Sequence, residues 1–292
     1  MSQSPLVAIV TPSLNAAAFI ERTIGSVLQQ DYPHIEYLVM DGGSSDATLE
    51  ILGRFEGRLQ YVSGPDGGQA AAVNRGFAQT RGEILAFVNA DDTLLPGAVT
   101  TAVHTFANRP DVSVVYGNGV YIDENDAPVV PYPVEPFDVE NLARRCFICQ
   151  PAAFFRREAF LAVGGLDPAL RFALDYDLWI RMARHSPPLT MVQIDQRLAA
   201  LRLHGRAKTM SEMGPALREA ISVLQRHYGY VPYNWLYGYG HHHLTGQSLA
   251  VDKPRPSLAS ACYSMAMGAR YNWRHPLRFC RDIVTTARQG LA

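Results

Sequence analysis

Short apolar segments alternate with segments of helical period over the first 120 residues, and this alternation limits the possible folds more than any other feature. LVAIVT, IEYLVM, LQYVSG, EILAFV and VSVVYG are predicted strands, and amphipathic stretches such as AFIERTIGSVLQQ and QAAAVNRGFAQT lie between them. Such spacing predicts right-handed βαβ units. The expected fold class is α/β, with a Rossmann-like, mostly parallel sheet and helices on both of its faces.

Three consecutive predicted strands run into acidic residues. IEYLVM is followed by Asp41, LQYVSG by Asp66, and EILAFV by Asp91 and Asp92. In an open parallel sheet, ligands bind beyond the carboxyl ends of the strands. Carboxylates gathered there repel one another unless a cation or a donor-rich ligand joins them. The pattern favours a nucleotide together with a divalent metal.

Bulk properties exclude several classes of protein. The chain has 292 residues and a formal net charge of −1, which argues against nucleic acid as the main partner. The chain shows no basic leader and no run of roughly 18 apolar residues that could span a bilayer. A cytoplasmic location is therefore expected. Cys146 and Cys149 are spaced like a metal or redox pair, but no second pair follows, so buried thiols are expected.

The segment NADD provides the main metal candidates. Mg²⁺ and Mn²⁺ usually bind through one or two carboxylates plus substrate phosphates. Asp91 and Asp92, on a turn after a strand, offer such a partial shell. Alternatively, Asp92 only caps the following helix. The neighbouring acidic strand ends favour the metal interpretation, and which of the two carboxylates holds most of the metal stays open.

The segments DGGSSD and PDGG provide nucleotide-binding candidates. Gly42 and Gly43 allow a flat ligand to approach the backbone, and Asp41 can accept from a base N–H or a ribose hydroxyl. Asp66 is also assigned to the ligand, although it fits ordinary turn chemistry. Arg75, in the predicted helix QAAAVNRG, faces either a phosphate or the solvent.

Two later segments add catalytic candidates. Asp175 and Asp177 lie two residues apart at the predicted start of a helix, so one can cap the helix while the other faces the cleft as a general base. In LRLHGRAKT, His204 can ligate a metal, and Arg206 and Lys208 can neutralise a diphosphate.

The second half of the chain is less regular. Residues 121–210 begin with a β-ribbon that turns at Asn125-Asp126 and continue as a mixed segment folding back on the first half. Residues 211–292 are expected to form a small separate helical region, with KPRP as a linker and three histidines at 241–243 in a surface loop. In its last helix, apolar residues flank a basic stripe of Arg274, Arg278, Arg281 and Arg288. This helix either docks on its own protein or lies on an anionic membrane, and vesicle flotation with and without residues 256–292 separates the two.

In order and spacing, TPSLN, DGGSSD, PDGG, NRG, NADD, QPAAFFRR and DYDLWIRM resemble the inverting family 2 glycosyltransferases of the GT-A fold. The resemblance covers about residues 5–210. It implies a GT-A domain over 1–210, with a nucleotide-binding half (1–120) and an acceptor half (121–210). It also implies sugar transfer from a nucleoside diphosphate sugar, UDP- or dTDP-type favoured, with Mn²⁺ or Mg²⁺. The implied acceptor is a hydroxyl of a surface polysaccharide or lipid-linked glycan, with peripheral contact at the inner face of the membrane as one option.

The resemblance assigns roles to individual residues. Asp175 matches the catalytic base, and the implied metal site consists of Asp91, Asp92 and His204. The positions implied to bind the nucleotide sugar are Pro12, Ser13, Asn15, Asp41, Gly42, Asp66, Arg75, Asn89 and Asp91. Asn89 stands where the family often has Asp, so Asp91 or Asp92 must hold most of the metal. Leu174 precedes the base where Glu is common, so Asp177 stays an alternative base.

Other functions compete with this one. A Rossmann oxidoreductase needs a glycine-rich turn after the first strand, and TPSLNAAA has no glycine. A P-loop kinase needs GxxxxGK[ST], which the chain lacks. A sugar-nucleotide nucleotidyltransferase would usually carry a glycine- and Arg/Lys-rich loop at this position. A non-catalytic sugar-nucleotide binding module remains the alternative from another class, since it predicts the same binding without turnover.

Overall fold

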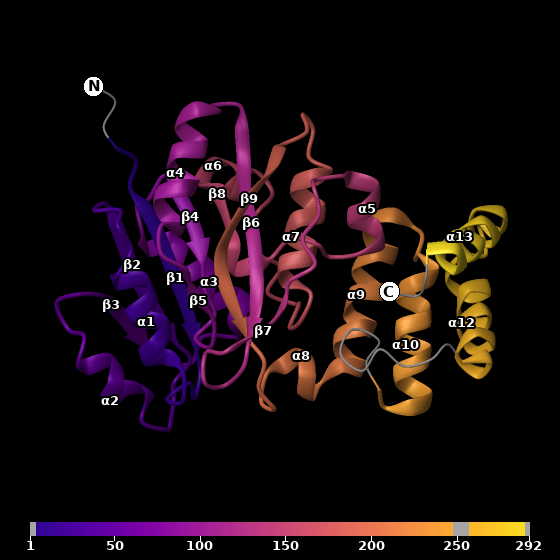
Figure 1. The fold of residues 1–292 in the computed structure, drawn as a ribbon, viewed down its shortest axis with the longest axis horizontal. Helices are drawn as coiled ribbons and strands as arrows, with labels where there is room; N and C mark the ends of the chain where they lie inside the picture. The colour runs from indigo at the N-terminus through magenta and orange to yellow at the C-terminus, as the bar shows by residue number, and fades with distance from the viewer. Residues whose placement is uncertain (1–3, 248–256, 290–292) are drawn as a thin grey trace. The chain divides into compact units, whose positions relative to one another are not determined.

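The computed structural model describes residues 4–247 and 257–289 and confirms the α/β class (Figure 1). In chain order the elements are β1 (Val7–Ser13), α1 (Ile20–Leu28), β2 (Ile35–Asp41), α2 (Thr48–Gly53), β3 (Gln60–Ser63), α3 (Gln69–Gln79), β4 (Ile84–Phe87), β5 (Thr93–Leu94), α4 (Ala98–Asn108), β6 (Val112–Ile122), β7 (Pro128–Pro131), α5 (Val139–Arg144), the short 3₁₀ helix η1 (Gln150–Ala152), β8 (Ala153–Arg156), α6 (Arg157–Ala162), α7 (Leu174–Ala183), β9 (Thr190–Arg202), α8 (Lys208–Ser211), α9 (Met213–Tyr228), α10 (Tyr233–Thr245), α12 (Leu258–Tyr271) and α13 (Pro276–Gln289).

The strands of the described residues form one mostly parallel sheet, as predicted. Its order is β3-β2-β1-β4-β8-β6-β9-β5, and β7 pairs with β6. β1, β2, β3 and β4 are parallel neighbours, and β6 runs parallel to β9. β8, β7 and β5 pair antiparallel with their neighbours. The predicted ribbon at 125–126 is confirmed, because β6 and β7 form a hairpin in which Asp126 adopts a left-handed φ of 70°.

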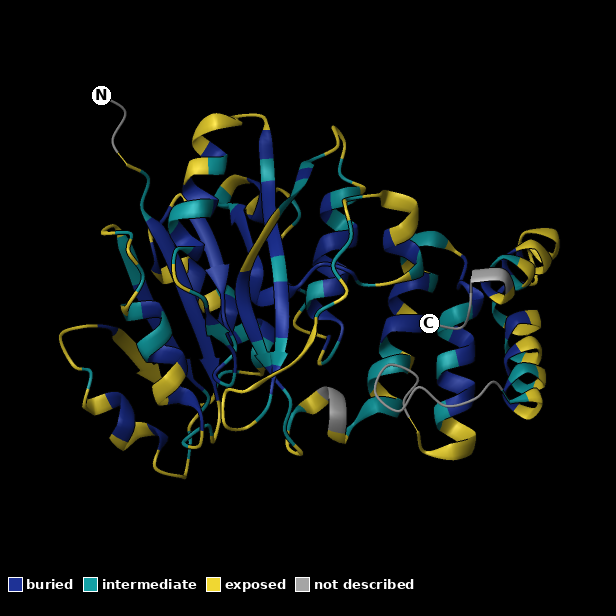
Figure 2. Ribbon diagram, in the orientation of Figure 1, coloured by how far each residue is buried: buried dark blue, intermediate teal, exposed yellow. Residues whose placement is uncertain are grey.

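Helices cover both faces of the sheet, as two adjacent residues of β8 illustrate. Phe154 of β8 packs in the apolar cluster that contains Ile24 of α1. The next residue, Phe155, points the opposite way and meets Phe77 of α3 and Trp179 of α7, each with a ring-centroid separation of 5.9 Å. This alternation follows from the period of two in a strand. It buries the central strands between two helical layers (Figure 2).

The register of the parallel strands brings their carboxyl ends to one edge. Ser13 at the end of β1 lies beside Asp41, which lies beside Ser63 of β3. On the other side of β1, Val10 pairs with Phe87, the last residue of β4. The segments that follow these four strands therefore leave the sheet at the same edge, as the acidic strand ends predict.

The chain divides into two compact units. The first comprises residues 1–137 and 147–204, and the second comprises residues 138–146 and 205–292. The helices expected near the C-terminus are present in the second unit. The segment 138–146, expected from the sequence in the acceptor half, also belongs to it. There the Arg144 guanidinium in α5 forms an ion pair with the buried Asp282 carboxylate of α13.

The prediction that the three histidines lie in a surface loop is wrong. They occupy the last turns of α10, where the His241 side chain is buried and stacks on Tyr237 at 6.1 Å between ring centroids. His243 is exposed. Successive residues of a helix point about 100° apart, so a run of identical residues faces several environments.

The cysteines follow the prediction only in part. Cys149 is buried, but Cys146 is partly exposed, and Cys262 and Cys280 are exposed. Cys146 and Cys149 also fall in different units. The predicted linker KPRP, at 253–256, lies outside the described residues.

Candidate functional site

Asn15 connects the segments that follow β1 and β2. Its φ of 51° lies in the left-handed region, which asparagine tolerates better than most residues. The Asn15 N–H donates to Ser44 Oγ (2.7 Å), and its side-chain Oδ1 accepts from the Ser45 N–H (2.9 Å). Pro12, on β1 beside this connection, is buried. Together these residues form one rim of the carboxyl edge of the sheet.

Asp41 is buried, and donors from its own loop and from β3 surround its carboxylate. The N–H groups of Gly43 (3.1 Å) and Ser44 (2.9 Å) donate to it, as do the hydroxyls of Ser44 (2.5 Å) and Ser63 (2.7 Å). This side chain therefore holds the DGGSS turn in shape. A direct contact of Asp41 with a base or ribose stays a prediction.

Gly42 and Asp66 lie against each other. A Cβ at position 42 would lie 3.0 Å from Asp66 Oδ2, so a side chain there would displace the carboxylate. The other oxygen of Asp66 accepts from the Gly68 N–H at 2.8 Å. Nearby on β1, the buried Ser13 Oγ has no hydrogen-bond partner within residues 4–247 and 257–289. Ser13, Gly42 and Asp66 thus meet where the first three strands end.

Asn89 is the centre of a side-chain amide network. Its Nδ2 donates to Asp92 Oδ2 (3.1 Å) and to Gln150 Oε1 (3.3 Å), and its Oδ1 accepts from Gln69 Nε2 (2.7 Å). Gln150 is anchored in turn on the Phe87 carbonyl at 2.7 Å. The network fixes the turn after β4. Neither glutamine was predicted from the sequence, although Gln150 lies in the QPAAFFRR segment.

The two adjacent aspartates of NADD have different surroundings. Asp92 is buried and accepts from the Arg202 N–H (3.0 Å) and from Asn89. Burial and the neighbouring Asp91 charge raise the pKa of the Asp92 carboxyl well above its usual value. Asp91 has a side chain that is 33% exposed, with its Oδ2 at 3.0 Å from His204 Nε2. Asp92 therefore faces the protein interior, and Asp91 remains accessible.

His204 combines burial with a free ring nitrogen. Its side chain is 8% exposed and its ring lies 4.7 Å from the Phe19 ring, between centroids. Nε2 faces Asp91, and the buried Nδ1 has no hydrogen-bond partner in the described part of the chain. Across residues 4–247 and 257–289, no group of three or more His, Cys, Asp or Glu side chains is arranged to hold a metal ion. A cation at Asp91 and His204 would need further ligands from a substrate, as is usual for Mg²⁺.

Arg202, which was not among the predicted site residues, connects the NADD turn to the turn between β6 and β7. Its fully buried guanidinium donates to the carbonyls of Asp91 (3.0 Å) and Asp123 (2.8 Å) and to Asp126 Oδ1 (2.6 Å). The guanidinium also lies over the Phe19 ring, 4.9 Å from its centroid. The available signal was that Arg202 interrupts the apolar run LAALRL.

Asp175 and Asp177 lie inside the first turn of α7, one and three residues after its first residue, Leu174. Ala173 occupies the N-cap position, so the expectation that one aspartate caps the helix is wrong. The buried Asp177 accepts from Arg181 Nε at 2.7 Å. Asp175 is partly exposed, and its Oδ1 accepts from the Tyr176 N–H at 2.8 Å. Desolvation raises the pKa of Asp175 to about 6.

The buried thiol of Cys149 is influenced by the charges of both Asp92 and Asp175. Burial raises the pKa of this thiol, and the charges of Asp92 and Asp175 raise it further. Both carboxylates are therefore close enough to act on one buried thiol. The NADD turn and His204 thus meet at the Asp91–His204 contact, and the charges of Asp92 and Asp175 both act on Cys149.

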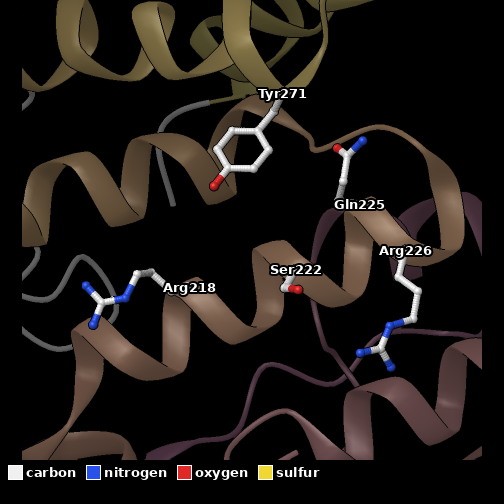
Figure 3. Close-up of a pocket in the computed structure, with 5 residues that line it drawn as sticks. All are labelled: Arg218, Ser222, Gln225, Arg226 and Tyr271. Atoms are coloured by element: carbon white, nitrogen blue, oxygen red, sulfur yellow. The ribbon is translucent and has the colours of Figure 1, made fainter.

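The remaining predicted cations are exposed. Arg75 is exposed on α3, and Arg206 and Lys208 are exposed in the second unit. That unit also has a hollow of about 340 Å³, lined by Arg218, Ser222, Gln225, Arg226 and Tyr271 (Figure 3). None of the site residues predicted from the sequence lines it.

Comparison with known proteins identifies relatives of both the sequence and the fold. Residues 8–164 match glycosyl transferase family 2. The chain is 32% identical over 198 residues to an uncharacterized glycosyltransferase of Mycobacterium tuberculosis, covering 65% of this chain and 74% of that one.

Two solved structures share the fold. TarS from S. aureus has a TM-score of 0.62 and 15% identity over 97% of this chain, and the chain spans 53% of its length. A structure of TarS 1-349 in complex with UDP-GlcNAc is also similar. The mannosyltransferase PcManGT from Pyrobaculum calidifontis, in complex with GDP-Man and Mn²⁺, has a TM-score of 0.57 and 19% identity, over 95% of this chain and 83% of that one. These likenesses identify the fold as GT-A type.

Proposed function

This chain belongs to glycosyl transferase family 2, and we propose that it moves a sugar from a nucleoside diphosphate sugar to an acceptor hydroxyl, with inversion and with Mn²⁺ or Mg²⁺. The observation that carries the proposal is the position of the accessible Asp91 carboxylate, 3.0 Å from His204 Nε2, just beyond β4. A carboxylate oxygen and an imidazole nitrogen converge there at the carboxyl edge of a parallel sheet, the usual ligand edge of such folds.

The donor occupies the rim formed by the segments after β1, β2 and β3. Ser13 Oγ, buried and unpartnered among the described residues, offers a hydrogen bond to the base or ribose. Asp66 and the backbone at Gly42 lie within reach of the same ligand, and Asn15 shapes the same rim. We retain a UDP- or dTDP-type donor; the structures of the same fold contain UDP-GlcNAc in TarS and GDP-Man in PcManGT.

The residues at the NADD turn fit a divalent metal. Asp91 supplies an accessible carboxylate and His204 an imidazole, while Asp92 and Arg202 fix the turn from behind. The PcManGT structure, which contains Mn²⁺, supports this choice of cofactor. When bound, the cation would neutralise the charge that grows on the departing diphosphate.

Asp175 acts as the general base. With a pKa of about 6, its carboxylate is ionised near neutral pH and still basic enough to take the proton of the acceptor hydroxyl. The acceptor oxygen then attacks the anomeric carbon from the face opposite the diphosphate, and this single displacement inverts the configuration. Asp177 is a weaker candidate because its ion pair with Arg181 already uses its carboxylate.

The acceptor is a surface polysaccharide or a lipid-linked glycan at the cytoplasmic face of a membrane. Among the described residues, no helix has the length and apolar character needed to cross a membrane. Any membrane contact in this proposal is therefore peripheral through the described part of the chain.

A thermal-shift panel with UDP, dTDP and GDP and their sugars, each with Mn²⁺ or with EDTA, tests donor and metal together. We expect the nucleotides of one base to raise Tm in Mn²⁺, and we expect this increase to disappear in EDTA. Release of nucleoside diphosphate then measures transfer, and Asp175→Asn should lower its rate by about 10²- to 10⁴-fold while keeping the donor affinity. A non-catalytic binding module would give the stabilisation without turnover. Absence of stabilisation by any donor would refute the proposal.

A further inference from the structure

The last helix, α13, turns apolar side chains toward the solvent. Leu277 is 77% exposed and Val284 is 50% exposed, and Cys280 between them is exposed as well. Residues 277, 280 and 284 follow the i, i+3, i+7 spacing of one helical face. Just before the helix, the Trp273 side chain is 68% exposed. These positions form an apolar stripe of α13 that faces the solvent.

The inward face of α13 is firmly held, and it includes the buried side chains of Phe279, Asp282 and Thr286. The buried Asp282 carboxylate pairs with Arg144 and accepts from Tyr230 Oη (3.1 Å) and the Tyr233 N–H (2.6 Å). At the preceding turn, Asn272 exchanges two hydrogen bonds with the backbone of Val231, at 2.9 and 2.8 Å. These contacts fix the orientation of the helix, so the exposed apolar stripe is a built feature of the unit.

α12 extends the same apolar character. Its buried face consists of Ser260, Ser264 and Gly268, while Leu258 (80% exposed) and Met265 are among its outward residues (Figure 2). An apolar hollow of about 330 Å³ is bounded by α10, α12 and α13, and Leu258 lines it. The hollow is therefore continuous with the exposed surface. We call the outward residues Leu258, Met265, Trp273, Leu277, Cys280 and Val284 the apolar face.

Within the described residues 257–289, the exposed charges are cations. Arg274, Arg278 and Arg281 are exposed along the turn and the first part of α13. Asp282 is the one acidic residue between positions 257 and 289, and it is buried against Arg144. The exposed surface of this described segment therefore carries positive charge without a compensating carboxylate.

We propose that the apolar face is a peripheral membrane-binding surface that docks on anionic phospholipid. Tryptophan and leucine enter the boundary between headgroups and acyl chains, while arginine side chains reach the phosphates. Docking of a second copy of this chain is disfavoured, because it would take the arginines out of water with no acidic partner on this face. The inference concerns the second unit alone, and it does not depend on the donor or the metal.

Vesicle flotation of the full chain, without nucleotide, tests the proposal. We expect the protein to partition onto phosphatidylcholine vesicles that contain phosphatidylglycerol, and much less onto phosphatidylcholine alone or at high salt. Replacing Trp273, Leu277 and Val284 together by Ser should lower the partition by at least about tenfold. Leu161→Ser, at an exposed leucine of the first unit, is the matched control and should change nothing.

A second variant tests the charge independently of the apolar contacts. Arg274→Gln with Arg281→Gln should lower the partition by about fivefold per arginine, and Arg58→Gln, at an exposed arginine of the first unit, should not. Unchanged circular dichroism and an unchanged thermal unfolding midpoint show that the variants remain folded. The proposal is overturned if the parent protein ignores anionic vesicles or if the triple Ser variant partitions equally well. It is also overturned if light scattering shows a dimer that the triple Ser variant loses while vesicle binding is absent.

Discussion

Replacing Asp175 with asparagine should make the protein more stable and almost inactive. The pKa of this carboxyl is about 6 in the folded chain, against a usual value of 3.8. A difference of about 2 pH units corresponds to about 3 kcal/mol at 1.36 kcal/mol per unit. Because the folded pKa is raised, the folded state holds the proton more tightly. Stability is therefore lost as the pH rises from about 4 to 6.

The substituted amide side chain carries no charge at any pH, so the gain depends on pH. We expect the free energy of unfolding of Asp175→Asn to exceed that of the parent protein by up to about 3 kcal/mol at pH 7.5 and to equal it near pH 4. Thermal unfolding between pH 4 and 8 measures this, and the gain at pH 7.5 corresponds to about 5 °C in Tm. In the parent protein, kcat/KM should rise to a plateau with an apparent pKa near 6.

Asp177→Asn is the matched control, because it changes the same chemical group in the same turn of the helix. Asp177 is buried and ion-paired with Arg181, so its removal leaves a poorly solvated cation. We expect Asp177→Asn to destabilise the protein by about 2 kcal/mol or more at pH 7.5. The two neighbouring substitutions thus have opposite effects on the stability of the protein at pH 7.5. A destabilised Asp175→Asn protein at every pH, or a flat kcat/KM between pH 5 and 7.5, would refute the desolvated-base argument.

Three further substitutions test other parts of the site and the fold. Asp91→Asn should abolish stabilisation by Mn²⁺ with donor, whereas Asp92→Ala should mainly lower Tm, because it removes the acceptor of the Arg202 N–H; a thermal-shift titration distinguishes them. Gly42→Ala should weaken donor affinity several-fold by displacing Asp66, and calorimetric titration measures this. Gly268→Ala should destabilise the second unit by about 1–3 kcal/mol in denaturant unfolding, since a Cβ there would overlap the Phe279 ring of α13.

Local features of the sequence were sufficient for the main strands and helices of the first 120 residues and for the edge where the candidate site lies. The strand preceding Asp41 and the helix of DYDLWIRM are each recognisable from period and composition. Likewise, acidic residues at successive strand ends predict a shared edge, because parallel strands end on the same side. The family resemblance rests on the same short segments, and the match of residues 8–164 agrees with it.

The distinct surroundings of neighbouring residues required the tertiary structure. Asp91 and Asp92 are equivalent in the sequence, but Asp92 accepts a hydrogen bond from the Arg202 N–H, 110 positions along the chain, and so turns inward. The same applies to His241, which packs on Tyr237 and lies within hydrogen-bonding distance of Ser260.

The sequence by itself therefore determined the fold class, the family and the edge that carries the candidate site, because these depend on patterns within short segments. Only the tertiary structure decided which carboxylate is accessible, that Arg202 braces the NADD turn, and that α13 turns its apolar stripe outward. A helical period shows that a helix has two unlike faces. Which face is buried depends on partners far away in the chain, here the Arg144 that holds Asp282.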